Sequence, residues 1–137
     1  MTVFVCVDDH NGTLFNHRRQ GQDRAVLKDM LDGAGTDIWM NEYSSRLFRE
    51  AADRVVIEEE FLACAPGDGC CFVENVPLRP YEDRLETLVV YCWNRTYPAD
   101  TYLDIDLSQN WEIIDTKEFG GTSHEKITRK TYERKNR

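Results

Sequence analysis

The pattern of apolar and polar positions predicts short strands that alternate with helices along most of the chain. Residues 2–7 form a β-branched and aromatic run that ends in a polar turn, which is typical of a buried first strand. From Asp23 onward the apolar spacing becomes helical, and Gly33 and Gly35 supply stop signals. The apolar positions of this helix are Val26, Leu27, Met30 and Leu31.

The same alternation continues through the middle of the chain. Further strands are predicted at residues 37–40, 54–57, 70–73 and 88–93. Helices are predicted at residues 42–52 and 81–84, whereas residues 15–21 and 64–69 have the polar and turn-forming composition of loops. Strands that alternate with helices indicate an α/β protein with parallel strand pairs.

The last part of the chain has a different pattern. Residues 111–116 and 125–132 are predicted to pair as an antiparallel hairpin, with Gly120 and Gly121 in the connection. The predicted fold class is therefore α/β: a mostly parallel central sheet with helices on both faces and a C-terminal antiparallel hairpin. Residues 1–137 are expected to form a single domain, and residues 133–137 a frayed tail.

Composition supports a folded domain and excludes several function classes. With 41% hydrophobic residues and 137 residues in total, the chain can form one modest core. It has 17 Lys and Arg against 25 Asp and Glu, a net charge of −8, which argues against binding a nucleic-acid backbone. No apolar run is long enough to span a membrane, and the first residues lack a basic leader, so neither membrane insertion nor secretion is expected.

The cysteines and histidines give no sign of a disulfide framework or a metal site. Five cysteines with one adjacent pair suit reduced thiols in a cytoplasmic protein better than disulfides. The spacing of Cys64, Cys70 and Cys71 is not that of a zinc site, and no histidine lies near them. Glycine-rich phosphate loops and the nucleophile elbow of hydrolases are also missing from the sequence.

The two ends of the chain carry a resemblance to a known family. Residues 99–114 (ADTYLDIDLSQNWEII) are similar to the "ADTYFPxID…WELV" ending of dihydrofolate reductases, and residues 131–134 match its "Y-x-R" terminus. Residues 3–12 resemble the first strand and loop of that family, and Gln22 with Asp23 resembles the start of its folate-binding helix. The resemblance implies a three-layer dihydrofolate reductase-like architecture. It also implies that the chain is shorter than a usual reductase by about one βα unit of ~30 residues.

The elements that hold cofactor phosphates in the family are replaced in this chain. Where the family has a Gly-Arg-Lys-Thr turn, residues 41–45 read Asn-Glu-Tyr-Ser-Ser, which lacks both cations and adds the charge of Glu42. Where the family has a Gly-Gly pair after a strand, this chain has Glu74 and Asn75. A carboxylate facing a pyrophosphate costs about 1–4 kcal/mol, depending on the local dielectric. No NADPH or other cofactor is therefore expected.

Asp23 is the one candidate catalytic residue, and two interpretations of it stand side by side. The resemblance implies a buried carboxylate that grips a pterin ring and helps to deliver a proton, a role that needs a raised pKa. An aspartate directly before a helix is equally typical of an N-cap, which stabilises a helix by about 1 kcal/mol. The two roles are compatible.

Two further groups of residues are candidates for binding a ligand. His17, Arg18 and Arg19 lie in a polar segment that the resemblance places over the cleft, where they could hold a carboxylate or phosphate or could simply be solvated. The second group follows predicted strands, at the edge of the sheet where ligands of open α/β folds bind. It consists of Asn41, Tyr43, Ser44, Glu74 and Asn75.

These observations favour a cytoplasmic, non-catalytic domain with a degenerate dihydrofolate reductase-like fold that binds a small molecule or a protein. Neither nucleic acid nor membrane is an expected partner. The alternative hypothesis is a divergent NAD(P)H-dependent reductase of pterins, folates or related compounds, in which Asp23 donates the proton and the cofactor is held in a new way.

Overall fold

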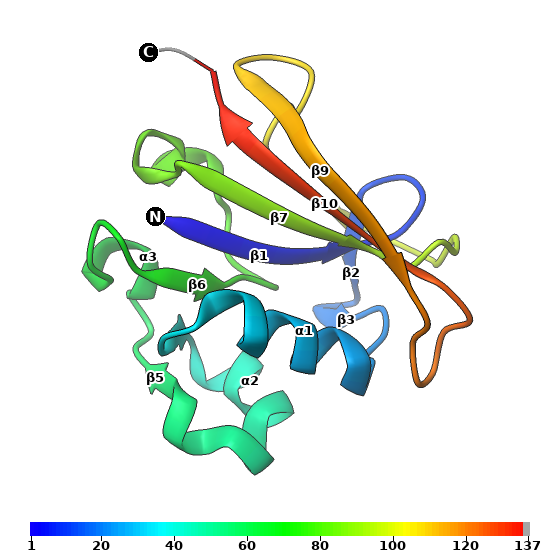
Figure 1. Ribbon diagram of the computed structural model, residues 1–137, viewed down its shortest axis with the longest axis horizontal. Helices are drawn as coiled ribbons and strands as arrows, with labels where there is room; N and C mark the ends of the chain where they lie inside the picture. Colours follow the sequence, from blue (N-terminus) through cyan, green and yellow to red (C-terminus); the bar gives the residue numbers. More distant parts are fainter. Residues whose placement is uncertain (136–137) are drawn as a thin grey trace.

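The computed structural model describes residues 1–135 and contains a seven-stranded sheet with the order β5-β4-β6-β1-β7-β10-β9 (Figure 1). The pairs β5–β4, β4–β6, β6–β1 and β1–β7 are parallel, whereas β10 pairs antiparallel with both β7 and β9. The strands are β1 (Thr2–Val7), β4 (Ile38–Met40), β5 (Val55–Ile57), β6 (Cys70–Phe72), β7 (Thr87–Cys92), β9 (Trp111–Phe119) and β10 (Ile127–Arg134).

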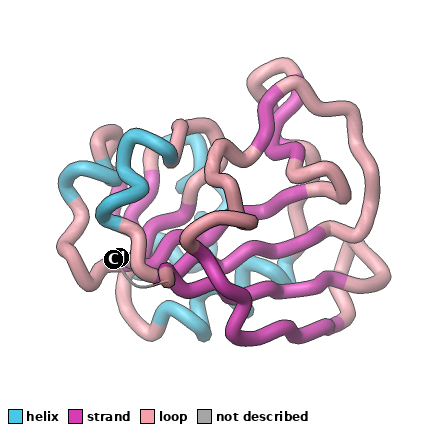
Figure 2. The backbone as a smooth tube through the Cα atoms, turned by 90° about the horizontal axis from the view of Figure 1, so that it is seen from above, coloured by secondary structure: helices cyan, strands magenta, loops and turns pink. Residues whose placement is uncertain are grey.

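Helical segments cover both faces of this sheet (Figure 2). Alternate residues of the central strand β1 supply the two cores: Val3 and Val5 face one layer, and Phe4 faces the other. The layer on Phe4 holds α1 (Arg24–Ala34), α2 (Glu42–Ser45) and the 3-10 segment η1 (Arg46–Arg54). The opposite layer holds α3 (Phe61–Cys64) and η2 (Arg79–Arg84). The predicted fold class is confirmed.

Helix α1 begins and ends where the sequence signals place its limits. Asp23 is the N-cap, and its side chain accepts a hydrogen bond from the backbone N–H of Ala25. Gly35 closes the helix in the left-handed conformation, with φ of 63°, which glycine adopts without steric cost. Gly33 lies inside the last turn and does not end the helix.

The predicted helix at residues 42–52 is only partly correct. Four residues form α2, after which the chain tightens into η1 and leaves helical geometry at Phe48 and Ala51. The kink accompanies the inward turn of Phe48, whose ring packs edge-on against Phe72 with centroids 5.7 Å apart. Tertiary packing therefore overrides the helical periodicity of this segment.

Residues 15–21, predicted as an irregular loop, instead contribute to a second, three-stranded sheet. It has the order β3-β2-β8 and consists of β2 (Gly12–Phe15), β3 (Arg18–Arg19) and β8 (Thr101–Tyr102). Asn16 and His17 form the two-residue turn of the β2–β3 hairpin, with φ of 52° and 61°. Positive φ at both positions is what such tight hairpins require. Helix α3 was likewise missed, because its four residues are too few to show a helical period along the sequence.

The C-terminal hairpin is longer than its apolar pattern predicts. Glu133 and Arg134 pair with β9, so the predicted frayed tail does not begin at residue 133, and residues 136–137 lie outside the described part of the chain. A β-bulge at Ile114 interrupts the pairing of β9 with β10. None of the helices among residues 1–135 is long and apolar enough to cross a membrane.

Candidate functional site

The carboxyl ends of the parallel strands bring most of the predicted ligand-binding residues together. Asn41 follows β4, and Glu74 and Asn75 follow β6, which lies beside β4 in the sheet. Arg19 reaches the same edge from the β2–β3 hairpin. This is the edge at which open α/β sheets usually bind their ligands.

Arg19 and Glu74 form the centre of this group. The Nε atom of Arg19 lies 2.8 Å from Oε2 of Glu74, and Nη2 lies 3.0 Å from Oε1, so the ion pair is bidentate. The Glu74 side chain is 9% exposed, which limits solvent screening of the pair. The guanidinium also lies over the ring of Tyr43, 4.4 Å from its centroid.

Tyr43 and Ser44 complete the coordination of this ion pair. The Tyr43 hydroxyl accepts a hydrogen bond from the backbone N–H of Arg19 over 2.9 Å. The Ser44 hydroxyl donates to Oε1 of Glu74 over 2.8 Å. We call Arg19, Tyr43, Ser44 and Glu74 the Arg19 cluster. Its polar groups bind one another across the edge of the sheet.

Asn41 and Asn75 extend the Arg19 cluster on one side. The Asn41 side chain caps α2 by accepting from the backbone N–H of Ser44 over 3.1 Å, and its amide donates to the side-chain oxygen of Asn75 over 2.8 Å. The two asparagines therefore connect the β4–α2 junction to the segment after β6. The oxygen and the nitrogen of the Asn41 side chain both have partners within the protein.

His17 and Arg18 lie apart from these contacts. Both are exposed on the β2–β3 turn, and neither side chain has a hydrogen-bond partner among the described residues. His17 lines a cavity of about 310 Å³ with Glu74 and Asn75, whereas Arg18 lines a different cavity of about 450 Å³. His17 and Arg18, which were predicted to lie over one cleft, thus line two separate surface hollows.

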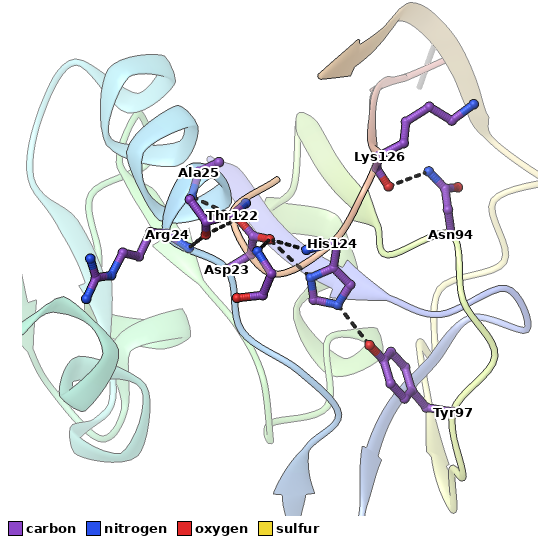
Figure 3. A network of polar contacts seen from close by, with 9 residues as sticks. Asp23, Arg24, Ala25, Asn94, Tyr97, Thr122, His124 and Lys126 are labelled. Carbon is purple, nitrogen blue, oxygen red and sulfur yellow. Dashed lines mark hydrogen bonds and ion pairs between the residues drawn. The ribbon is translucent and has the colours of Figure 1, made fainter. Parts of the chain in front are cut away.

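Asp23 lies at the centre of a second network, which the β9–β10 connection builds over the start of α1 (Figure 3). Oδ1 accepts from the backbone N–H groups of Ala25 and Thr122 and from the Thr122 hydroxyl, at 2.9, 2.9 and 3.0 Å. Oδ2 accepts from the N–H groups of Ser123 and His124 and from His124 Nδ1, at 2.8, 3.0 and 3.1 Å. We call Asp23 and residues 122–124 the Asp23 network.

His124 connects the Asp23 network to the core and to a tyrosine. Its ring stacks on Trp93 with centroids 4.5 Å apart, and its Nε2 lies 2.8 Å from the Tyr97 hydroxyl. In the neutral ring, Nδ1 carries the proton and donates to Asp23, while Nε2 accepts from Tyr97. His124 is buried and both of its nitrogen atoms are partnered, so it serves the loop as an anchor.

The ionisation of Asp23 follows from this geometry. Burial disfavours the charged carboxylate and is the largest single influence on its pKa. The backbone donors of Thr122 and Ser123, with the side chains of His124 and Thr122, outweigh burial and hold the pKa of Asp23 well below its ordinary value. A carboxylate that stays ionised does not have the raised pKa that a proton donor needs at neutral pH.

Between the Arg19 cluster and the Asp23 network only a small space remains. This partly open cavity has a volume of about 20 Å³, which is room for about one water molecule. Its lining includes Cys6, Gln20 and Trp93 together with Arg19, Asp23 and Glu74. These side chains fill the space directly between the two networks, whereas larger hollows of about 310, 450 and 780 Å³ open beside Glu74, Arg19 and Asp23, respectively.

Sequence reasoning missed the residues that surround Asp23. Thr122, Ser123 and His124 lie about a hundred residues from Asp23 along the chain, and only the turn-forming Gly120 and Gly121 marked this segment. A Cβ atom on Gly121 would overlap the Asp23 carboxylate and lie 2.6 Å from the carbonyl oxygen of His124. The glycine thus allows the loop to approach the carboxylate. Within residues 1–135 there is no group of three or more side chains placed to bind a metal ion.

Comparisons with known proteins support the architecture and leave the activity open. No protein-family model matches the chain, and no curated protein matches its sequence. Among solved structures, dihydrofolate reductase from Enterococcus faecalis, complexed with NADP(H) and RAB-propyl, is similar with a TM-score of 0.69 and 12% sequence identity. The match covers 98% of this chain and 96% of the reductase chain. The chain has a dihydrofolate reductase-like fold.

Proposed function

We propose that the chain is a non-catalytic binding domain, built on the dihydrofolate reductase-like fold, in which the protein's own side chains replace substrate and cofactor in the cleft. One observation carries this proposal: the space directly between Arg19, Glu74 and Asp23 has a volume of only about 20 Å³, so no cofactor-sized ligand can contact all three side chains at once. The hollows beside Glu74 and Asp23, of about 310 and 780 Å³, lie within the range of about 300–1,000 Å³ that is typical of small-molecule sites, and are the places where such a domain would bind.

The residues at the carboxyl edge of the sheet do not fit the phosphates of a nicotinamide cofactor. Helix α2 has only four residues, and its first turn carries Glu42, whose charge repels an anion. Glu74 puts a second carboxylate at the position where the family has glycine, and Arg19 already neutralises it. A bound pyrophosphate would have to displace Glu74 from Arg19 and leave that carboxylate partly buried. These residues therefore do not fit NADPH in the manner of the family.

Asp23 acts in this proposal as a structural anion. Each of its oxygen atoms already accepts three hydrogen bonds, so a pterin ring could reach the carboxylate only by displacing residues 122–124. The same carboxylate caps α1 through the backbone N–H of Ala25 and holds the β9–β10 connection through the N–H groups of residues 122–124.

The five cysteines support a reducing compartment, and we propose a cytoplasmic location for the protein. All of them are free thiols, and Cys70 and Cys71 are buried next to one another in β6 without forming a bond. Secreted domains of this size commonly use disulfides for stability, and this chain does not.

The alternative is a divergent reductase, and an activity assay separates the two functions. Purified protein is incubated with NADPH and dihydrofolate, and oxidation of NADPH is followed by absorbance, with a genuine dihydrofolate reductase as positive control. The binding-domain proposal expects no oxidation above the rate without protein. Turnover that disappears in the Asp23→Asn variant, while the variant remains folded by circular dichroism, would establish the reductase instead.

A further inference from the structure

Strand β9 forms one edge of the seven-stranded sheet, and its outer side is unpaired within residues 1–135. It pairs only with β10, along whose outer side it runs in Figure 1. With nine residues it is a long edge, whereas β5, at the other edge of the sheet, has three. A long edge presents a row of free backbone N–H and C=O groups that can pair with a strand of another chain.

The side chains of β9 are uncovered on both faces of the sheet. Residues 112–118 are all exposed, whereas a strand packed on one face alternates between buried and exposed positions. Two of these residues, Ile113 and Ile114, are apolar and are 48% and 49% exposed. Natural edge strands are commonly kept short or interrupted by proline, and β9 has neither protection.

The charged side chains in the middle of β9 are arranged symmetrically about Thr116. Asp115 precedes it and Lys117 follows it. Charges on an edge strand usually prevent pairing with another chain. When two copies of β9 run antiparallel with Thr116 opposite Thr116, however, Asp115 of each copy faces Lys117 of the other, and the charges attract.

Both of these charged side chains are available for such contacts. Lys117 has no ion-pair or hydrogen-bond partner within residues 1–135. The carboxylate of Asp115 is 58% exposed, and its ion pair with Arg129 is long, at 3.7 Å. A second β9 strand would therefore satisfy a lysine that lacks a partner and a carboxylate that has a weak one.

The register centred on Thr116 is selected by charge. A shift of the symmetry axis to Asp115 places two carboxylates opposite one another, and a shift to Lys117 places two ammonium groups opposite one another. An axis between Thr116 and Lys117 puts Asp115 opposite Glu118, and one between Asp115 and Thr116 forms no ion pair. Among these registers, only the one centred on Thr116 brings opposite charges together.

From this arrangement we infer that β9 pairs antiparallel with β9 of a second copy of this chain, in a symmetric dimer whose axis passes through Thr116. The same surface of each copy meets itself, which is the usual form of a two-fold interface. Ile113 and Ile114 come to lie opposite residues 118–119 of the second copy, which reduces their contact with water. The pairing ends at two copies, because it uses the β9 edge of both.

The interface lies away from the candidate functional site. None of the residues of β9 lines the cavity between the Arg19 cluster and the Asp23 network or the three larger hollows. The dimer therefore leaves these hollows open to solvent. The inference goes beyond the proposed function and does not rest on it.

Analytical ultracentrifugation of the full chain, from low micromolar to high micromolar concentration, tests the inference. The mass should rise with concentration from the 16.0 kDa of one chain towards twice that value. Lys117→Glu and Asp115→Lys should each weaken the dimer at least about tenfold, because either change puts like charges opposite one another twice per dimer. Arg49→Glu is the control for Lys117→Glu, since it makes the same charge change at an exposed position on η1 and should alter the affinity less than about twofold.

The two β9 variants differ in their effect on overall charge. Asp115→Lys makes the acidic chain less negative, which by itself favours association. Weakening by this variant therefore points to the local contact with Lys117. Circular dichroism and thermal melting verify that each variant folds, which matters for Asp115→Lys because it removes the contact with Arg129.

Mixing the two variants tests the register itself. In the mixed pair, Asp115 of the Lys117→Glu chain faces Lys117 of the Asp115→Lys chain, and the introduced glutamate faces the introduced lysine. With one variant carrying a fluorescent label, the mixture should form a heterodimer within about threefold of the wild-type affinity.

Four results would overturn the inference. These are a wild-type chain that stays monomeric over the whole concentration range, an undiminished dimer of Lys117→Glu, an equal loss in Arg49→Glu, or a mixture of two folded variants that does not associate. If Asp115→Lys does not fold, Lys117→Glu and its control still decide the question. None of these outcomes bears on the proposed function, which the NADPH oxidation assay tests separately.

Discussion

Arg19 and Glu74, which lie 55 residues apart in the chain, form a bidentate ion pair across the carboxyl edge of the central sheet. Arg19 belongs to the small second sheet and Glu74 follows β6, so the pair joins two sheets that share no strand. Together with the hydrogen bonds around Asp23 it leaves a cavity of about 20 Å³. The chain thus has a dihydrofolate reductase-like fold in which the space directly between the two networks is largely filled by the protein's own side chains.

The ion pair between Arg19 and Glu74 should be strongly coupled. In a double-mutant cycle with Arg19→Ala and Glu74→Ala, we expect a coupling free energy of about 1–3 kcal/mol, because both groups are shielded from solvent. Urea denaturation measures the four free energies of unfolding. The same cycle at the exposed pair of Lys28 and Asp32 should give no more than about 0.5 kcal/mol. Equal coupling at the two pairs would contradict this account.

Replacing Gly121 should destabilise the protein, because an added Cβ overlaps the Asp23 carboxylate and approaches the carbonyl oxygen of His124 to 2.6 Å. We expect Gly121→Ala to lower the free energy of unfolding by at least about 2 kcal/mol. Gly120→Ala is the matched control, since its nearest contact would be at 3.9 Å, and it should change stability by no more than about 1 kcal/mol. Thermal or urea denaturation measures the stability of both variants. Equal losses of stability in Gly121→Ala and Gly120→Ala would contradict the close approach of this loop to Asp23.

Asp23 should contribute to stability in a pH-dependent way. Its pKa is lower in the folded protein than in the unfolded chain, so its contribution is complete above the unfolded value of about 3.9 and is lost as pH falls through the folded value. We expect Asp23→Asn to cost about 2–4 kcal/mol at neutral pH. The difference in the free energy of unfolding between Asp23→Asn and the wild type should become smaller below about pH 4.

Urea denaturation across this pH range gives the profile for Asp23→Asn. Asp32→Asn serves as control, because Asp32 is exposed and should show only a small difference at any pH. If the difference in the free energy of unfolding between Asp23→Asn and the wild type stays constant from neutral to strongly acidic pH, the hydrogen bonds around Asp23 do not favour its ionised form.

The cysteines should differ sharply in reactivity. Cys64 is the exposed thiol, whereas burial raises the pKa of Cys70 and raises that of Cys71 to about 12, which suppresses the thiolate. Titration of the native protein with a thiol reagent should show one fast-reacting group, which disappears in Cys64→Ser. Fast reaction of the adjacent pair in β6, or formation of a disulfide between Cys70 and Cys71 under mild oxidation, would contradict this prediction.

The fold could be predicted from the sequence mainly where local pattern and tertiary environment agree. Buried strands such as β1 and β7 are continuous apolar runs, and α1 has its cap and its terminal glycine in sequence order. The prediction was wrong at η1, where the inward turn of Phe48 breaks the helix. The β2–β3 hairpin was also missed, because Asn16 and His17 are an uncommon pair for a two-residue turn.

The candidate site could be predicted only in part, for a physical reason. Asn41, Glu74 and Asn75 follow strands, so their position at the carboxyl edge is encoded locally. The pairing of Glu74 with Arg19, and of Asp23 with His124, depends on how distant loops fold onto that edge. No periodicity along the chain signals such contacts, and the small space that they leave between them could be found only in three dimensions.

Direct titration with NADPH tests the central claim that the pairing of Glu74 with Arg19 leaves the carboxyl edge of the sheet without a site for the phosphates of a nicotinamide cofactor. Nicotinamide fluorescence excited through the protein's tryptophans is recorded as NADPH is added to the millimolar range, with a genuine dihydrofolate reductase measured in parallel. The account predicts no saturable signal and no rise in melting temperature for this protein. Saturable binding in the micromolar range would contradict it, because the cofactor would then have a phosphate site despite the Glu74 carboxylate and its ion pair with Arg19.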